Sequence, residues 1–453
     1  MTTKRIVSFL TALLMAGSFA ACGDPAVSGD PSGTPSNSAS TAPGQTVSTQ
    51  GSSGTTEESA SGPITTGGTS AVTEATRTST SPAPTNPPPS INSSSTTTTT
   101  EAPQVKEYYS SAVGMWYTVW WDSQEKDEFY YNHHWGKETR VKPVKFGYYA
   151  TDDEAKLEYD FKMFKRWGID YLILDDTNDH YADGGNISRH IDACFSMARK
   201  LGDKAPKLNF AGGRPLINGN TAGMQAELDI FAAYAAGYRE NTFFWKGKPL
   251  FVNFNIPKNY GYQDADGRFT MRPAAGHVSE GWAYQYKYGI DKTGMYGWVF
   301  DVQYEKSEIH GISPGFSRSH NNLGTSAPPI SRENGDRFRN EWLAAVKRKP
   351  EMIVISSWND HAEETGIEAV ELLESIPGRG EEDPFFYEKI TEGYLALKTG
   401  YLDGFCYRSE SDSQMYRYNA SSNKLMKVSG VGAHDPYIIV PDDYFAWAGV
   451  PRS

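Results

Sequence analysis

The feature that most constrains the fold is the segment 351–368, which reads E-M-I-V-I-S-S-W-N-D-H-A-E-E-T-G-I-E. Its apolar run at 352–355 is rich in β-branched residues, which is typical of a strand buried on both faces. A polar turn with several acids follows at once. In a parallel α/β barrel, the carboxyl ends of the strands carry the chemistry, so this pattern favours such a barrel. The alternative is a solvated acidic loop that follows a core strand.

Two acids in this turn, Asp360 and Glu363, lie three residues apart, directly after Trp358 and Asn359. One carboxyl group can hold a proton while the other stays ionised, which is the arrangement that cleaves glycosidic bonds. An aromatic ring and an amide suit contacts to a sugar. We therefore predict that Asp360 and Glu363 are catalytic and that Trp358, Asn359 and Glu368 bind substrate.

The first 22 residues have the pattern of a secretory signal. Lys4 and Arg5 precede an apolar run from 6 to about 16, and two alanines precede Cys22. This ending resembles a bacterial lipobox, in which the cysteine is lipidated and becomes the mature N-terminus. The resemblance implies an extracellular protein held at the bacterial cell surface through its lipid anchor only. The alternative is an ordinary cleaved signal in which Cys22 has no special role.

Residues 23–104 have a different composition, dominated by Ser, Thr, Gly and Pro, with no aromatic residue and a run of five threonines at 96–100. Such a segment cannot bury enough apolar surface to offset its conformational entropy. We expect a disordered linker that acts as a stalk for the remaining residues, 105–453.

The segment 105–453 is long enough for one large catalytic domain. The chain carries 43 basic and 55 acidic residues, and a net charge of −12 argues against nucleic acid as a partner. Only Cys194 and Cys406 lie in this domain, and no Cys/His set has metal-ligand spacing. We therefore predict no disulfide framework, no metal and no cofactor, and we expect a monomer.

Strand and helix patterns alternate through this domain, which predicts a parallel sheet. A capping box at 151–154 begins a helix that ends at Gly168, and a further helix at 336–349 feeds the acidic segment. The number of units favours a (β/α)8 TIM barrel, and 409–453 reads as a small C-terminal β appendage. The predicted strands are 113–121, 169–174, 207–211, 249–255, 296–304, 312–316, 352–355 and, least clearly marked, 403–407.

Polar residues follow several other predicted strands. If these strands are parallel, their carboxyl ends share one edge of the barrel, so the side chains are candidates for substrate binding. Loop capping, satisfied interior polar groups and core packing are the alternatives. The further candidates are Trp120, Asp175, Asp176, Asn253, Asn255 and Asp301.

Four motifs together resemble glycoside hydrolases of family 99. They are F-G-Y-Y-A-T-D-D at 146–153, W-G-I-D-Y-L-I-L-D-D at 167–176, S-P-G-F at 313–316 and S-S-W-N-D-H-A-E-E-T-G-I-E at 356–368. The resemblance implies a (β/α)8 fold and a retaining, endo-acting enzyme for α-mannan. It also implies that Asp360 assists the substrate 2-hydroxyl as base, through a 1,2-anhydrosugar, and that Glu363 is the general acid/base.

The last motif departs from the family pattern S-W-N-E-W-H-E-G-T-Q-I-E. Asp360 is one methylene shorter than the expected Glu, and His361-Ala362 stands where Trp-His is expected. The hexad W-N-D-H-A-E is closer to the W-N-D-Y-G-E of family 71 α-1,3-glucanases, whereas the T-G-I-E ending favours family 99. Two alternatives therefore stay open: an endo-α-1,3-glucanase and a non-catalytic surface glycan-binding protein.

Overall fold

The computed structural model describes one part of the chain in detail, and the signal and linker predicted at 1–104 lie outside it. The predicted strand at 296–304, with Asp301, and the predicted site residue Asn255 also lie outside the described residues. No helix in the described part is long and apolar enough to span a membrane. The described residues are 107–122, 135, 139–181, 185–217, 219–254, 259, 261–274, 308–317, 329–376, 378–379, 383–432 and 435–450.

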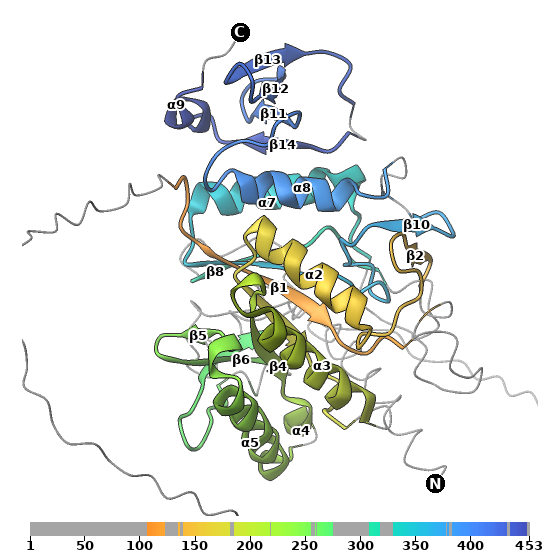
Figure 1. Ribbon diagram of the computed structural model, residues 1–453, viewed down its shortest axis with the longest axis vertical. Coiled ribbons are helices and arrows are strands. Elements are labelled where there is room, and N and C mark those ends of the chain that lie inside the picture. Colours follow the sequence, from red (N-terminus) through yellow and green to blue (C-terminus); the bar gives the residue numbers. More distant parts are fainter. Residues whose placement is uncertain are drawn as a thin grey trace, which may run out of the picture. The chain divides into compact units, whose positions relative to one another are not determined.

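Seven parallel strands form the central sheet (Figure 1). Their spatial order is β7-β6-β4-β3-β1-β9-β8, so the last strand of this sheet along the chain, β9, pairs with the first, β1. This cyclic order is that of a (β/α) barrel, and it confirms the predicted α/β class. The strands are β1 (Ala112–Thr118), β3 (Tyr171–Asp175), β4 (Lys207–Gly212), β6 (Lys248–Phe254), β7 (Thr270–Ala274), β8 (Ile309–Ile312) and β9 (Met352–Ile355), with the short antiparallel β5 (Phe244–Trp245) beside β6.

Alternate residues of the strands belong to two hydrophobic clusters, as the period of two requires. Met115, Tyr117 and Leu172 join the cluster that includes the inner faces of the helices. Trp116 and Ile173, on the opposite face, belong to a second cluster within the curved sheet. Both faces are therefore buried, which explains why these strands read as continuous apolar runs.

The register places the carboxyl ends of neighbouring strands level with one another. Thr118 of β1 lies opposite Asp175 of β3, and Asp175 lies opposite Ala211 of β4. Gly212 of β4 lies opposite Asn253 of β6. Polar residues that are far apart in the sequence thus meet at one edge of the sheet.

The helices cover the outer face and begin close to where the sequence predicts. Asp153 caps the first of them through a 3.0 Å hydrogen bond from the Lys156 amide, while Thr151 accepts from the Trp121 amide at 3.2 Å. The cap is therefore Asp153 and not the Thr151 of the predicted capping box. The helices are α2 (Glu154–Trp167), α3 (Asn186–Leu201), α4 (Arg214–Ile217), α5 (Thr221–Gly237), α7 (Asp336–Arg348), α8 (Phe386–Ala396) and α9 (Tyr444–Ala448).

The structure corrects two strand predictions and contains one strand, β7, that the sequence did not predict. The eighth strand expected at 403–407 is wrong, because β11 (Cys406–Ser409) belongs to a separate four-stranded sheet. The strand β7 was missed because its sequence, T-M-R-P-A, contains an arginine and a proline. The strand predicted at 312–316 lies earlier, at Ile309–Ile312.

The predicted C-terminal appendage is confirmed as a sheet of order β13-β12-β11-β14. Its further strands are β12 (Met415–Asn419), β13 (Lys424–Val428) and β14 (Tyr437–Val440). It packs on α7 and α8, where Arg339 Nε donates to the Tyr437 carbonyl at 3.1 Å and the Ile439 amide donates to the Tyr394 hydroxyl at 3.0 Å. These two helices lie between it and the parallel sheet (Figure 1).

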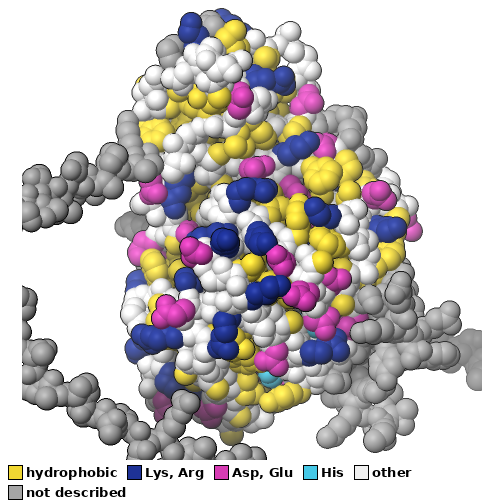
Figure 2. Space-filling view, in the orientation of Figure 1, with side chains coloured by type: hydrophobic (Ala, Val, Ile, Leu, Met, Phe, Trp, Pro, Cys, Tyr) yellow, Lys and Arg dark blue, Asp and Glu magenta, His cyan; other side chains and the backbone are white. Residues whose placement is uncertain are grey.

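The surface carries charges of both signs. Figure 2 shows basic and acidic side chains interspersed over one face, without a large area of a single sign. A small two-stranded sheet, β2 (Val141–Pro143) with β10 (Val370–Leu372), completes the fold beside the loop that follows β9.

Candidate active site at the carboxyl ends of β3 and β9

The turn after β9 is held by its own hydrogen bonds. The Asp360 amide donates to Ser357 Oγ at 2.9 Å, and Asp360 Oδ1 accepts the Glu363 amide at 2.9 Å. The amides of Thr365 and Gly366 both donate to the Asp360 carbonyl at 3.0 Å. Asp360 is 1% exposed, whereas Glu363 is partly exposed. The turn thus fixes both acids on a rigid backbone at the end of a barrel strand.

Asn359 connects this turn to β1. Its Oδ1 accepts the Thr118 amide at 2.8 Å, and its Nδ2 donates to the Thr118 carbonyl at 3.1 Å. The Asn359 carbonyl accepts Trp121 Nε1 at 3.0 Å. Both ends of the amide are therefore bound to backbone, so Asn359 positions the turn, in contrast with the substrate contact that the sequence suggests.

Asp175 lies at the end of β3, beside β1. Its Oδ1 accepts the Thr177 amide at 3.1 Å and the Thr177 hydroxyl at 2.7 Å. Burial raises the pKa of Asp175 to about 7, and the negative charge of Glu363 acts in the same direction. Asp175 and Glu363 are therefore close enough to influence each other, as expected for residues of one site.

Asp176 and Glu227 form a second pair of buried acids next to Asp175. Asp176 Oδ2 lies 2.7 Å from His180 Nδ1, and Glu227 Oε1 accepts the Gly213 amide at 2.7 Å. Burial raises the pKa of both carboxyls well above their usual values, and Asp176 further raises that of Glu227. Glu227 was not among the predicted site residues, because it lies on α5 and does not follow a predicted strand.

The end of β4 is shaped by glycine. A Cβ at Gly212 would lie 2.1 Å from Glu227 Oε1. Any larger residue there would push the carboxyl away from the Gly213 amide. The pair Gly212-Gly213 thus lets an acid from α5 reach the strand ends.

Two further candidates at the strand ends, Asn253 and Trp120, are largely buried. Asn253 is 1% exposed, and its Nδ2 donates to the Asn259 carbonyl at 2.9 Å. Trp120 is 9% exposed, with its ring tilted against that of Trp121 at 6.4 Å. Asn253 therefore supports a loop at the carboxyl ends, and Trp120 presents only a small part of its ring.

The side chains of Trp358 and Glu368 contact residues of α2. The Trp358 ring packs edge-on against Phe164 at 4.8 Å and near Trp167 at 6.1 Å, and it is 1% exposed. It belongs to the core between the sheet and α2, because apolar helix side chains cover it. This corrects the expectation that its ring stacks on a sugar.

Glu368 belongs to a buried ion network. It lies 3.0 Å from Lys156 Nζ and 3.1 Å from His361 Nε2, and it accepts a 2.8 Å hydrogen bond from the Tyr149 hydroxyl. Burial alone would raise its pKa, but the charges of Lys156 and His361 bring it below the usual value. Glu368 therefore anchors the acidic turn to α2, in place of the predicted substrate contact.

In the part of the chain that the structure describes, no group of three His, Cys, Asp or Glu side chains could hold a metal ion. The acids at the strand ends are bonded to amides, hydroxyls and one histidine. This donor set suits proton transfer and hydrogen bonding to hydroxyl groups.

The chain matches no protein-family model and no curated protein. It is similar in fold to two structures of the GH99 endo-alpha-mannosidase from Bacteroides thetaiotaomicron, one of them in complex with BIS-TRIS-propane, at 16% and 15% identity. Each has a TM-score of 0.48, with 62% of this chain and 96% of the other covered. A glycoside hydrolase-like protein gives 13% identity and a TM-score of 0.43, with 65% and 95% covered.

Proposed function

We propose that this protein is a retaining glycoside hydrolase that cleaves an α-linked polysaccharide. The observation that carries the proposal is the placement of Asp360 and Glu363 in one hydrogen-bonded turn at the carboxyl end of β9. The proposal is supported by the effect of the Glu363 charge, which raises the pKa of Asp175 at the end of β3 in addition to burial. Convergent carboxyl groups at this edge of a barrel are the arrangement that glycosidic chemistry requires.

In this mechanism Glu363 gives its proton to the glycosidic oxygen as the bond to the anomeric carbon breaks. Asp360 takes the proton of the substrate 2-hydroxyl, whose oxygen closes on the anomeric carbon to form a 1,2-anhydrosugar. Glu363 then takes a proton from water, which opens the anhydro ring, and Asp360 returns its proton to O2. Two displacements at the same carbon retain the configuration.

Asp175 suits a substrate contact in this scheme. With a pKa raised to about 7, it has a protonated form that can donate to a sugar hydroxyl near neutral pH. Its ionised form can only accept. Substrate affinity is therefore expected to depend on pH across neutrality.

For the substrate we propose endo-acting cleavage of α-mannan, in which O2 lies trans to the leaving group as the anhydrosugar step requires. The alternative on the motifs at 356–368 is α-1,3-glucan, in which O2 lies cis, so its cleavage would not use that step. For the location we propose the bacterial cell surface, with lipidation at Cys22 and residues 23–104 as a stalk. Both parts of the proposal rest on the sequence.

The test compares Glu363→Gln and Asp360→Asn on natural glycan and on an α-glycosyl fluoride. We expect each change to lower turnover of the glycan about 10²–10⁴-fold. The fluoride needs no protonation of its leaving group, so Glu363→Gln should be largely rescued on it and Asp360→Asn should not. Glu351→Gln, at the opposite and exposed end of β9, serves as the control. Wild-type turnover of glycan by Glu363→Gln would overturn the assignment.

One observation favours a second candidate, a non-catalytic glycan-binding protein. Asp360 is 1% exposed, and one of its oxygens is already occupied by the Glu363 amide. Buried capping acids of this kind also stabilise turns without any chemistry. Binding of α-mannan or α-glucan by the wild type, with no product from a panel of both, would establish this candidate.

A further inference from the structure

Two buried arginines lie close to the ring of one tyrosine. Arg332 is 2% exposed, Arg379 is 7% exposed and Tyr387 is 2% exposed. The guanidinium carbons lie 4.6 Å and 5.7 Å from the centroid of the Tyr387 ring. Two cations held this close in a low-dielectric environment need an anion to balance them.

Arg332 uses only part of its donor capacity. Its Nη2 donates to the carbonyls of Glu364 and Gly366 at 2.6 Å and 2.9 Å, which fixes the end of the acidic turn. Its Nε and Nη1 are buried and have no hydrogen-bond partner within the described ranges. Arg332 does not line the cavity beside Tyr387, so it contributes positive charge near that cavity and no direct contact to a ligand in it.

Arg379 lines a cavity of about 350 Å³ together with Tyr387. Within the described part of the chain, no acid forms an ion pair with Arg379. Burial and the charge of Arg332 lower the pKa of Arg379 to about 9. Glu364, which acts in the opposite direction, is already bonded to Arg140 Nε at 2.9 Å.

Tyr387 adds a neutral donor to the same cavity. Its hydroxyl is buried and, among the residues with a defined position, has no hydrogen-bond partner. It lies in the first turn of α8, whose N-cap residue Phe385 gives no side-chain cap. The positive end of this 11-residue helix therefore adds to the two guanidinium charges.

The acids in the cavity wall do not neutralise these cations. Asp383 accepts Lys389 Nζ at 2.6 Å and the Phe385 amide at 2.9 Å. Glu371 is exposed and lies opposite Lys142 in the pairing of β10 with β2. Asp383 is thus paired with Lys389 and Glu371 is exposed, so Arg379 supplies the buried charge in the cavity wall.

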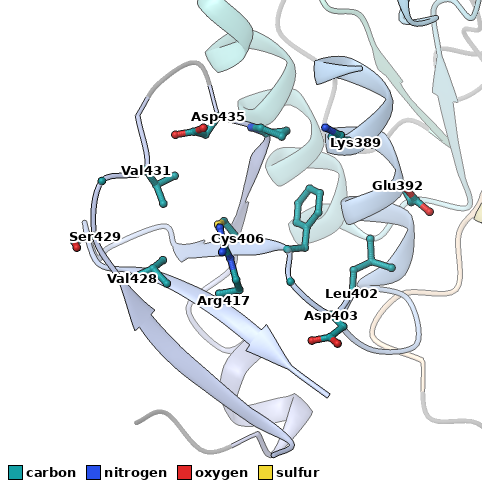
Figure 3. A pocket seen from close by; sticks show the side chains of 14 residues that line it. Lys389, Glu392, Leu402, Asp403, Cys406, Arg417, Val428, Ser429, Val431 and Asp435 are labelled. Atoms are coloured by element: carbon teal, nitrogen blue, oxygen red, sulfur yellow. The ribbon is translucent and has the colours of Figure 1, made fainter. Parts of the chain in front are cut away.

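A larger cavity, of about 670 Å³, lies between α8 and the C-terminal sheet and shows the opposite situation (Figure 3). Lys389 is paired with Asp383, Asp403 accepts the Ala420 amide at 3.0 Å, and Asp435 accepts the Gly432 amide at 2.6 Å. Because these charges are satisfied within the protein, its size alone does not indicate a ligand.

We propose that the cavity lined by Arg379 and Tyr387 binds a small oxyanion, as a free ion or as the sulfate, phosphate or carboxylate group of a modified glycan. Guanidinium groups bind such oxygens in a planar, bidentate manner, and the Tyr387 hydroxyl supplies a further donor. A volume of about 350 Å³ holds one such group with the sugar ring that bears it. The proposal is independent of the catalytic roles assigned to Asp360 and Glu363.

The test titrates the full chain with sodium sulfate, sodium phosphate and sodium glucuronate at an ionic strength held constant with NaCl. Calorimetry and the melting temperature are the readouts. We expect saturable binding of at least one of these anions and a rise in melting temperature that follows its occupancy. Arg379→Gln should weaken binding at least tenfold, and Tyr387→Phe severalfold. Arg417→Gln, in the larger cavity, is the matched control and should bind like wild type.

Comparing the affinities of different anions also distinguishes a free ion from a substituent of a glycan. Tighter binding of a glucuronate-bearing oligosaccharide than of sulfate or phosphate supports a glycan substituent, and the reverse order supports a free ion. Without anion, Arg379→Gln should melt at or above the wild-type temperature, because it removes one of two repelling charges. Failure of all three anions to bind beyond chloride, or unchanged binding by both Arg379→Gln and Tyr387→Phe, would overturn the proposal.

Discussion

Glu368 and Asp175 are both buried carboxyl groups, yet their pKa values are shifted in opposite directions. Glu368 is 5% exposed and Asp175 is 1% exposed. The pKa of Glu368 lies below its usual value, whereas that of Asp175 is raised to about 7. The difference is Lys156, which lies 3.0 Å from Glu368. Burial by itself does not decide the charge of an acid in this protein.

Asp160 shows that one cation does not lower the pKa of both acids beside it. It is bonded to the same Lys156, which is itself fully buried. Burial and the charge of Glu368 nevertheless raise the pKa of Asp160 to about 6. Lys156 thus brings the pKa of Glu368 below its usual value, whereas it only partly offsets the effect of burial on the pKa of Asp160. Among the described residues, Asp175 has no such cation beside it, and a carboxyl group of that kind is available to a substrate.

The largest expected effect on stability comes from removing the cation. Lys156→Met leaves Asp160 and Glu368 buried without their partner and should destabilise the fold by about 3–5 kcal/mol at pH 7. Since the pKa of Glu368 is depressed, its contribution is fully present above its ordinary value of 4.5 and is lost as the pH falls below that. Denaturant unfolding at pH 7 and pH 3.5 measures both the loss and its decrease in acid.

A matched control for this variant lies further along α2. Lys162 is paired with Glu158 at the surface, and its side chain is 49% exposed. Lys162→Met should change the free energy of unfolding by less than about 1 kcal/mol, because exposed pairs contribute little. Equal effects of the two substitutions would show that burial does not distinguish the two lysines.

Asp175→Asn tests the acid without a cation. A folded pKa of about 7, above the ordinary 3.8, means that ionisation of Asp175 opposes folding as the pH rises between these values. The variant should therefore be stabilised relative to wild type by about 2–4 kcal/mol at pH 8 and much less at pH 4. Melting temperatures across this range measure the difference, with the exposed Asp203→Asn as control. A difference that does not change with pH would contradict the raised pKa.

The smallest effect is expected for Glu227→Gln. Burial and Asp176 raise the pKa of Glu227 well above its usual value, which favours the neutral carboxyl. A glutamine has the same shape and can still accept the Gly213 amide, so stability at pH 6 should change by less than about 1 kcal/mol. A loss of several kcal/mol in thermal or denaturant unfolding would mean that Glu227 is ionised and paired.

Most of the barrel strands could be predicted because they are buried on both faces and read as apolar runs. The segment 352–355 was located to the residue and the helix at 336–348 to within a residue, whereas α2 begins two residues later than a cap at Thr151 predicts. The strand β7 was missed, since pairing with β6 and not its own composition makes it a strand. The strand expected at 403–407 was assigned to the wrong sheet, because a short apolar run does not indicate which strands it pairs with.

The sequence by itself determined the α/β class, the alternation of strands and helices, and the position of Asp360 and Glu363 just beyond a buried strand. These features follow from local periodicity, which each segment carries within itself. Only the tertiary structure decided which polar residues meet and what surrounds them. It placed Glu227 beside Asp176, Trp358 in the core and Lys156 against Glu368. The charge and access of a side chain depend on neighbours that are distant in the sequence, and no local pattern encodes those neighbours.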